Sequence, residues 1–189
     1  MLTDNEIQKL ESRAQDIRAT IIKMLVAAGS GHTAGPLGMA DIFTAFYFHI
    51  LAHDPKHPDW PERDRLVLSN GHICPVLYAA LAHAGYFPVE ECLTLRKLGS
   101  RLQGHPERLR LAGLETTSGP LGEGLSQASG MAYAFRMDLP AGRQAGKQRV
   151  YCLMSDGEQE EGNIWEAAMF AGKHKLHNLT AVIDRNNIQ

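Results

Sequence analysis

The sequence predicts an α/β fold in which helices cover both faces of a parallel β-sheet. Three short stretches read as strands, at residues 65–69, 149–154 and 179–183. Stretches with apolar residues at helical spacing separate them. Strands that alternate with helices are typical of a parallel sheet covered on both faces. The 189 residues, 44% of them hydrophobic, are enough for one domain with its own core.

The chain begins with a long predicted helix. Thr3 and Glu6 have the spacing of a capping box. Apolar side chains then recur at helical spacing at Ile7, Leu10, Ala14, Ile17, Ile21 and Met24, so the helix is expected to reach residue 27. A second helix is expected over residues 37–51, and a loop with three prolines over residues 53–63.

The remaining elements follow in the order expected for an α/β chain. The first strand leads into a helix over residues 74–84, and Pro88 begins a short helix to residue 98. Residues 99–118 are predicted to be mostly loop, and residues 121–137 a helix whose small side chains suit close packing on the sheet. The last helix is expected over residues 163–173. Residues 141–148 contain two glycines and no apolar periodicity, so we predict an exposed, flexible loop there.

Composition and charge exclude several classes of protein. The formal net charge of −2 leaves no basic footprint for nucleic acid. No apolar run reaches membrane-spanning length, and the acidic start is unlike a signal peptide, so we expect a cytoplasmic protein. Cys74, Cys92 and Cys152 lie too far apart for a Cys-x-x-Cys metal site. We interpret them as small buried residues in a reducing compartment.

Two polar turns follow the last two predicted strands. Asp156 and Gly157 follow the first of these strands, and Asn186 follows the second. Ligands bind at the carboxyl ends of strands in open α/β sheets, so Asp156 and Asn186 can face one point. Carboxylate, amide and backbone carbonyl oxygens are ligands that Mg²⁺ accepts, and Gly157 lets the backbone approach a phosphate. The alternative is two ordinary turns, because Asp-Gly is a common turn signal.

The two turns resemble the thiamin diphosphate motif, and four further motifs accompany them. These are Ser-Gly-His-Thr-Ala-Gly-Pro-Leu-Gly at residues 30–38, Leu-Ser-Asn-Gly-His at 68–72, Gly-His-Pro-Glu at 104–107, and Ser-Gly-Pro-Leu-Gly-Glu-Gly at 118–124. In this order they resemble the amino-terminal half of transketolase over roughly residues 14–189. The resemblance implies the thiamin diphosphate-binding fold.

The resemblance implies a role for each matching residue at the diphosphate end of the cofactor. Asp156 and Asn186 would hold the metal, with the carbonyl oxygen of Ile188 as a third protein ligand. Gly157 would contact the diphosphate through its backbone, and His72 would lie beside it. The implied cofactors are thiamin diphosphate and Mg²⁺, with Ca²⁺ or Mn²⁺ as alternatives.

The resemblance also implies roles at the reacting end. Gly119 and Leu121 would flank the aminopyrimidine ring, and the Gly119 carbonyl would accept from its amino group. His32 and His105 would reach the sugar and help move its protons, since imidazoles titrate near working pH. Glu161 resembles a glutamate in the hydrogen-bond network that links paired active sites. The implied reaction transfers a two-carbon ketol unit between sugar phosphates in the pentose phosphate pathway.

Two departures from the family pattern affect these expectations. Ser155 stands where the motif usually has Gly, and a positive φ at that position would cost Ser about 1 kcal/mol or more. The chain also stops just beyond Ile188, so residues 1–189 are expected to form one diphosphate-binding domain that is incomplete at its carboxy end and lacks the pyrimidine-binding domain. We therefore expect the amino-terminal part of a transketolase, from a truncated gene or a two-chain enzyme, marginally folded and inactive when isolated.

Partners and alternatives follow from the same resemblance. The expected partner is a pyrimidine-binding domain or a carboxy-terminal transketolase subunit, in a dimer or a dimer of heterodimers that acts on sugar phosphates. Fragments resembling 1-deoxyxylulose 5-phosphate synthase or dihydroxyacetone synthase are alternatives within thiamin diphosphate enzymes. A non-catalytic remnant that binds cofactor or dimerises is an alternative from another class.

Overall fold

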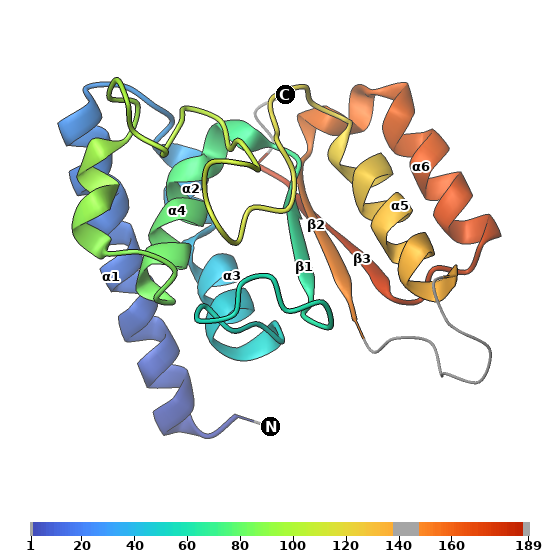
Figure 1. Cartoon of the computed structure of the whole chain (residues 1–189), viewed down its shortest axis with the longest axis horizontal. Helices are drawn as coiled ribbons and strands as arrows, with labels where there is room; N and C mark the ends of the chain where they lie inside the picture. Colours follow the sequence, from blue (N-terminus) through green and yellow to red (C-terminus); the bar gives the residue numbers. More distant parts are fainter. Residues whose placement is uncertain (1, 138–147, 187–189) are drawn as a thin grey trace. The chain divides into compact units, whose positions relative to one another are not determined.

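A computed structural model describes residues 2–137 and 148–186 of the chain, which divide into two compact units (Figure 1). The first unit comprises residues 1–59 and 72–113, and the second comprises residues 60–71 and 114–189. The predicted flexible loop at 141–148 lies outside the described residues except for its last position.

The first unit consists of helices and loops. Its elements are α1 (Asp4–Ala28), α2 (Ala34–Gly38), α3 (Ala40–Ala45), the π-helix η1 (Phe46–Ile50), α4 (Cys74–His83) and the 3-10 helix η3 (Val89–Thr94). The capping box is confirmed, because the Thr3 side chain accepts the Glu6 N–H and the Glu6 carboxylate accepts the Thr3 N–H. Gly29 ends α1 in the left-handed conformation, at φ 64°.

Two predicted helices of this unit differ from the structure. The single helix expected over residues 37–51 begins earlier, at Ala34, and is broken at Met39, whose ψ of 1° interrupts the helical backbone between α2 and α3. The helix expected from Pro88 to residue 98 is only the short η3. It cannot continue, because Leu95 is extended at ψ 129° and Arg96 adopts a positive φ of 60°.

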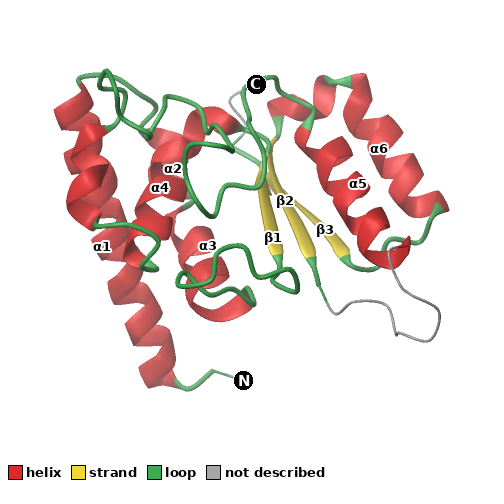
Figure 2. Ribbon diagram, viewed as in Figure 1, coloured by secondary structure: helices red, strands yellow, loops and turns green. Residues whose placement is uncertain are grey.

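The second unit contains the whole sheet. Its strands β1 (Arg65–Leu68), β2 (Val150–Ser155) and β3 (Leu179–Asp184) lie in the order β1-β2-β3, and both pairs are parallel. The helices of this unit are α5 (Gly124–Met137), the 3-10 helix η4 (Gly157–Glu160) and α6 (Gly162–Lys173). Figure 2 shows the three strands side by side, with α5 and α6 lying next to each other. The predicted α/β class with a parallel sheet is confirmed, and each strand ends within a residue of its predicted bounds.

One face of β2 forms the core of this unit with α5 and α6. Val150, Cys152 and Met154 are fully buried on alternate positions of the strand. Small residues of the helices pack on them, at Ala128 and Ala132 of α5 and Ala167 of α6. Alternate side chains of a strand point to one face, so the small helix residues allow the close approach that the sequence predicted.

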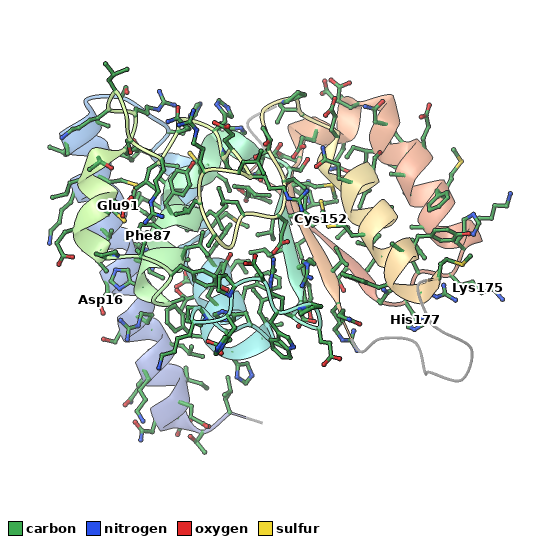
Figure 3. The ribbon with its side chains drawn as sticks, in the orientation of Figure 1. Asp16, Phe87, Glu91, Cys152, Lys175 and His177 are labelled. Atoms are coloured by element: carbon green, nitrogen blue, oxygen red, sulfur yellow. The ribbon has the colours of Figure 1, made fainter. Side chains whose placement is uncertain are left out.

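The three cysteines are buried and form no disulfide. Burial raises the pKa of the Cys74 thiol to about 12, so this thiol stays protonated and inert at physiological pH. Cys152 lies on β2 within the core (Figure 3). Their interpretation as small core residues is confirmed. In the described part of the chain, no helix has both the length and the apolar character needed to cross a membrane.

Candidate cofactor and substrate site

The turn after β2 is fastened to the end of its neighbour β3. The backbone N–H of Asp156 donates to the backbone carbonyl of Asp184 over 3.1 Å, and Ser155 and Asp184 are register partners. Asp156 also caps η4, and its Oδ1 accepts the Gly157 N–H at 3.1 Å. The predicted metal ligand Asp156 therefore lies at the carboxyl end of the sheet, where ligands bind in open α/β folds.

Two carboxylates share this end of the sheet. Burial raises the pKa of Asp184 above its ordinary value, and the negative charge of Asp156 raises it further. Two like charges disfavour each other's ionised form when they lie close together. Asp184 was not identified as a site residue from the sequence. Its position, an acidic residue at the end of a predicted strand, was the feature that could have indicated it. The paired carboxylates favour a bound cation at this edge.

The donors at this end of the sheet are oxygen atoms. Asn186 is exposed and lies two residues beyond the end of β3, and Ile188 lies outside the described residues. Across residues 2–137 and 148–186, no three His, Cys, Asp or Glu side chains gather as a metal site. Carboxylate and amide oxygens fit a hard cation such as Mg²⁺, whereas zinc sites favour sulfur and nitrogen ligands. The donor set therefore fits the expected magnesium.

A glycine loop is held beside the acidic turn. Gly122 has a positive φ of 85°, and a Cβ there would lie 2.7 Å from the Cβ of Glu161. The Gly122 N–H donates to the buried carboxylate of Glu158 at 2.9 Å. In contrast, nothing lies within 4 Å of where a Cβ of Gly119 would be, and Leu121 is 39% exposed. The loop is thus anchored at Gly122, whereas Gly119 faces open space and the Leu121 side chain is partly exposed.

Ser155 does not carry the backbone strain that was expected for a positive φ. It is the last residue of β2, is 8% exposed, and is not among the residues with positive φ. Its N–H donates to Glu158 Oε2 at 2.8 Å. Since this bond needs only a backbone amide, Ser and Gly can both supply it.

The three candidate histidines gather in the first unit, although the sequence separates them by up to 73 positions (His32 to His105). The rings of His32 and His72 have their centroids 4.8 Å apart. Partial desolvation lowers the pKa of His105, and the neighbouring Arg96 guanidinium and His32 imidazole lower it further. A lowered pKa keeps this imidazole neutral near physiological pH, so that it can accept a proton.

Arg96 is a further residue of this cluster that sequence reasoning missed. It is one of two described non-glycine residues with a positive φ, at 60°. Its guanidinium packs on Gly104, where a Cβ would lie 2.9 Å from the Arg96 Nε. A strained backbone persists only where the surrounding structure determines it, and such residues cluster at functional sites. Gly104 directly precedes His105, so Arg96 packs against the segment that carries this candidate histidine.

The fold and these turns define a class of protein, an α/β domain with a polar turn at the carboxyl ends of parallel strands, where open α/β folds bind ligands. The family model described as the transketolase, thiamine diphosphate binding domain matches residues 10–189. The chain belongs to this family. The resemblance of the sequence to the amino-terminal half of transketolase is confirmed.

The relatives include a protein named as a transketolase subunit and others named as transketolase. The 6-deoxy-6-sulfo-D-fructose transketolase subunit of Clostridium sp. (strain MSTE9) is 45% identical over 95% of this chain and 63% of its own length. Transketolase of Mus musculus is 42% identical over 97% of this chain and 28% of its own length. A crystal structure of transketolase from Campylobacter jejuni has a TM-score of 0.88 and 40% identity, over 96% of this chain and 29% of its own. The chain thus spans less than two thirds of the length of these relatives.

Proposed function

We propose that this chain is the amino-terminal part of a transketolase, which transfers a two-carbon ketol unit from a ketose to an aldose in the pentose phosphate pathway. The observation that carries the proposal is the acidic turn at Asp156, which is fastened to β3 at the carboxyl end of the parallel sheet. Membership of the family supports two parts of the proposal: that the chain binds thiamin diphosphate, and that the enzyme is a transferase.

The strand-end residues are proposed to hold the metal and the diphosphate. Asp156 and Asn186 would bind Mg²⁺ through side-chain oxygens, and Ile188 through its backbone carbonyl. Gly157 would offer its backbone to a phosphate oxygen, and His72 would lie beside the diphosphate. The carboxylate pair at the ends of β2 and β3 supports a cation here, because the cation neutralises charge that otherwise repels.

The loop and histidine residues are proposed to hold the ring and the sugar. Gly119 and Leu121 would flank the aminopyrimidine, and Glu161 would belong to the network between paired sites. When bound, thiamin diphosphate supplies the nucleophilic carbon and the electron sink for cleavage of a carbon–carbon bond. His105, neutral because its pKa is lowered, would accept a proton from a substrate hydroxyl, and His32 would help return one to the new fragment.

The partner is proposed to be a pyrimidine-binding domain or a carboxy-terminal transketolase subunit. Residues 1–189 would then be the diphosphate-binding domain of a dimer or of a dimer of heterodimers. One relative at 45% identity is named as a subunit, which supports the two-chain arrangement. That relative is named for a sulfonated ketose, so sulfonated as well as phosphorylated ketoses belong in the set of donors to be tested.

The metal site is tested by binding rather than by turnover. Titrating thiamin diphosphate with Mg²⁺ into the protein with its partner should give saturable binding and a rise in melting temperature. Asp156→Ala should weaken binding by about tenfold or more, since it removes a charged ligand. Glu160→Gln removes an exposed charge from η4, the short helix that Asp156 caps, and should bind thiamin diphosphate and Mg²⁺ as tightly as the wild type. Equal binding by wild type and Asp156→Ala would refute the proposed metal site.

The reaction is tested with a panel of substrates. The protein with its partner should transfer a ketol unit from phosphorylated or sulfonated ketoses to an aldose phosphate. Release of carbon dioxide from pyruvate with glyceraldehyde 3-phosphate as acceptor would instead favour a 1-deoxyxylulose 5-phosphate synthase. Cofactor binding without any transfer would favour the non-catalytic alternative.

A further inference from the structure

The side chain of Glu158 is fully buried in the second unit, at 0% exposure. Burying a carboxylate is costly unless hydrogen bonds replace its water. Its two oxygens accept from four donors: Oε1 from the Gly122 N–H at 2.9 Å and the Ser69 hydroxyl, and Oε2 from the Ser155 N–H at 2.8 Å and, at 3.3 Å, the Ser155 hydroxyl. None of the salt bridges among the described residues includes Glu158, so hydrogen bonds replace the water that its carboxyl group loses on burial.

The four donors come from three separate segments of the same unit. Ser69 directly follows β1, Gly122 belongs to the loop that precedes α5, and Ser155 ends β2. The Ser69 hydroxyl also accepts the N–H of Gly124, the first residue of α5, at 3.1 Å. One carboxylate therefore fastens the glycine loop and the amino end of α5 to the turn that carries Asp156.

We propose that Glu158 is a positioning residue for the cofactor, which holds the loop at residues 118–122 and the turn at Asp156 and Gly157 in their binding conformation before the cofactor arrives. The inference rests on the proposed function, because those two segments are the proposed contacts with the ring and with the diphosphate. Preorganised loops raise affinity, since ordering them costs nothing at the moment of binding.

The chemistry of the site requires a carboxylate and not merely a polar side chain of that size. An ionised carboxylate only accepts hydrogen bonds, which matches four surrounding donors. Glutamine has the same shape, but its amide nitrogen would face the N–H of Gly122 or that of Ser155, and neither N–H can accept a hydrogen bond. Glu158→Gln should therefore release either the Gly122 side or the Ser155 side of the network.

The test separates positioning from simple stability. Glu158→Gln and the control Glu160→Gln are purified with the natural partner, and thiamin diphosphate with Mg²⁺ is titrated by calorimetry. We expect Glu158→Gln to bind about tenfold more weakly and to exchange backbone amides faster at residues 119–124 and 153–158 without cofactor. The cofactor KM should rise while kcat at saturating cofactor stays near that of the control.

Each outcome decides the inference. A Glu158→Gln protein with a lowered unfolding midpoint but wild-type cofactor affinity would overturn it, because the residue would then serve stability alone. If Glu158→Gln does not fold, Ser69→Ala replaces it: it removes one donor and the link to Gly124, and unchanged affinity there would overturn the inference. Absence of binding by the wild type and by Glu160→Gln would instead overturn the proposed function itself.

Discussion

The sharpest stability prediction concerns Gly124, the first residue of α5. A Cβ added there would lie 2.5 Å from the Oγ and 2.7 Å from the backbone Cα of Ser69, and nearer still to its Cβ. Because one of these atoms belongs to the backbone, rotation of the serine side chain cannot remove the collision. Gly124→Ala should therefore push α5 away from the end of β1.

The expected loss of stability has two parts. Overpacking a rigid site costs about 1–3 kcal/mol. The displaced Ser69 hydroxyl would lose its hydrogen bond to the Glu158 carboxylate, and a bond to a charged group contributes about 1.5–3 kcal/mol. Together Gly124→Ala should lower the free energy of unfolding by about 2.5–6 kcal/mol.

Gly130 on the same helix is the matched control. Nothing lies within 4 Å of where its Cβ would be, and the residue is exposed. Gly130→Ala should raise the free energy of unfolding by about 0.5–1 kcal/mol, because Ala loses less backbone freedom in a helix.

The assay is urea unfolding followed by tryptophan fluorescence. Both tryptophans, Trp60 and Trp165, belong to the second unit, so the signal reports the unit that contains α5. If the free energies of unfolding of Gly124→Ala and Gly130→Ala differ by less than about 1 kcal/mol, α5 does not approach Ser69 as closely as the structure indicates.

Two further predictions follow from titrating groups of the first unit. Arg96→Met should shift the acid limb of kcat/KM to higher pH, because it removes a positive charge that lowers the pKa of His105, and His105 is proposed to act in its neutral form. Lys97→Met should leave the acid limb of kcat/KM at the wild-type pH. If neither variant shifts that limb, Arg96 does not lower the pKa of His105. Burial, and then the charge of Arg13, lower the pKa of His83 below its ordinary value of 6.5. Below this pH the folded protein binds fewer protons than the unfolded one, so the free energy of unfolding should fall as the pH drops below about 6.5. The variant His83→Gln should flatten this pH dependence. If the free energy of unfolding of His83→Gln still falls as steeply with pH, His83 is not the source of the dependence.

Much of the arrangement at the carboxyl end of the sheet was predictable, because strand patterns are local. The apolar runs before Asp156 and Asn186 identified the strands, and the carboxyl ends of parallel strands lie at one edge of a sheet. The structure places the end of β2 against the end of β3 as this argument requires. The assignment of ligands and catalytic residues beyond that placement stays a prediction.

Other features depended on contacts that no local pattern shows. Glu158 is one of several acidic residues in a polar turn, and only the tertiary structure shows it buried among donors from three segments. The left-handed backbone of Arg96 ended a helix that propensity would have continued. The break at Met39 likewise interrupted an apolar pattern that favoured one helix.

The sequence by itself determined the α/β class, the strands and the family, because these depend on hydrophobic period and on short motifs read along the chain. Only the tertiary structure decided which groups hold those motifs in place: the buried carboxylate of Glu158, the backbone hydrogen bond from Asp156 to Asp184, and the contact of Gly124 with Ser69. The physical reason is that burial and hydrogen bonding depend on which residues meet in space, and residues 69, 122 and 158 meet only once the chain has folded.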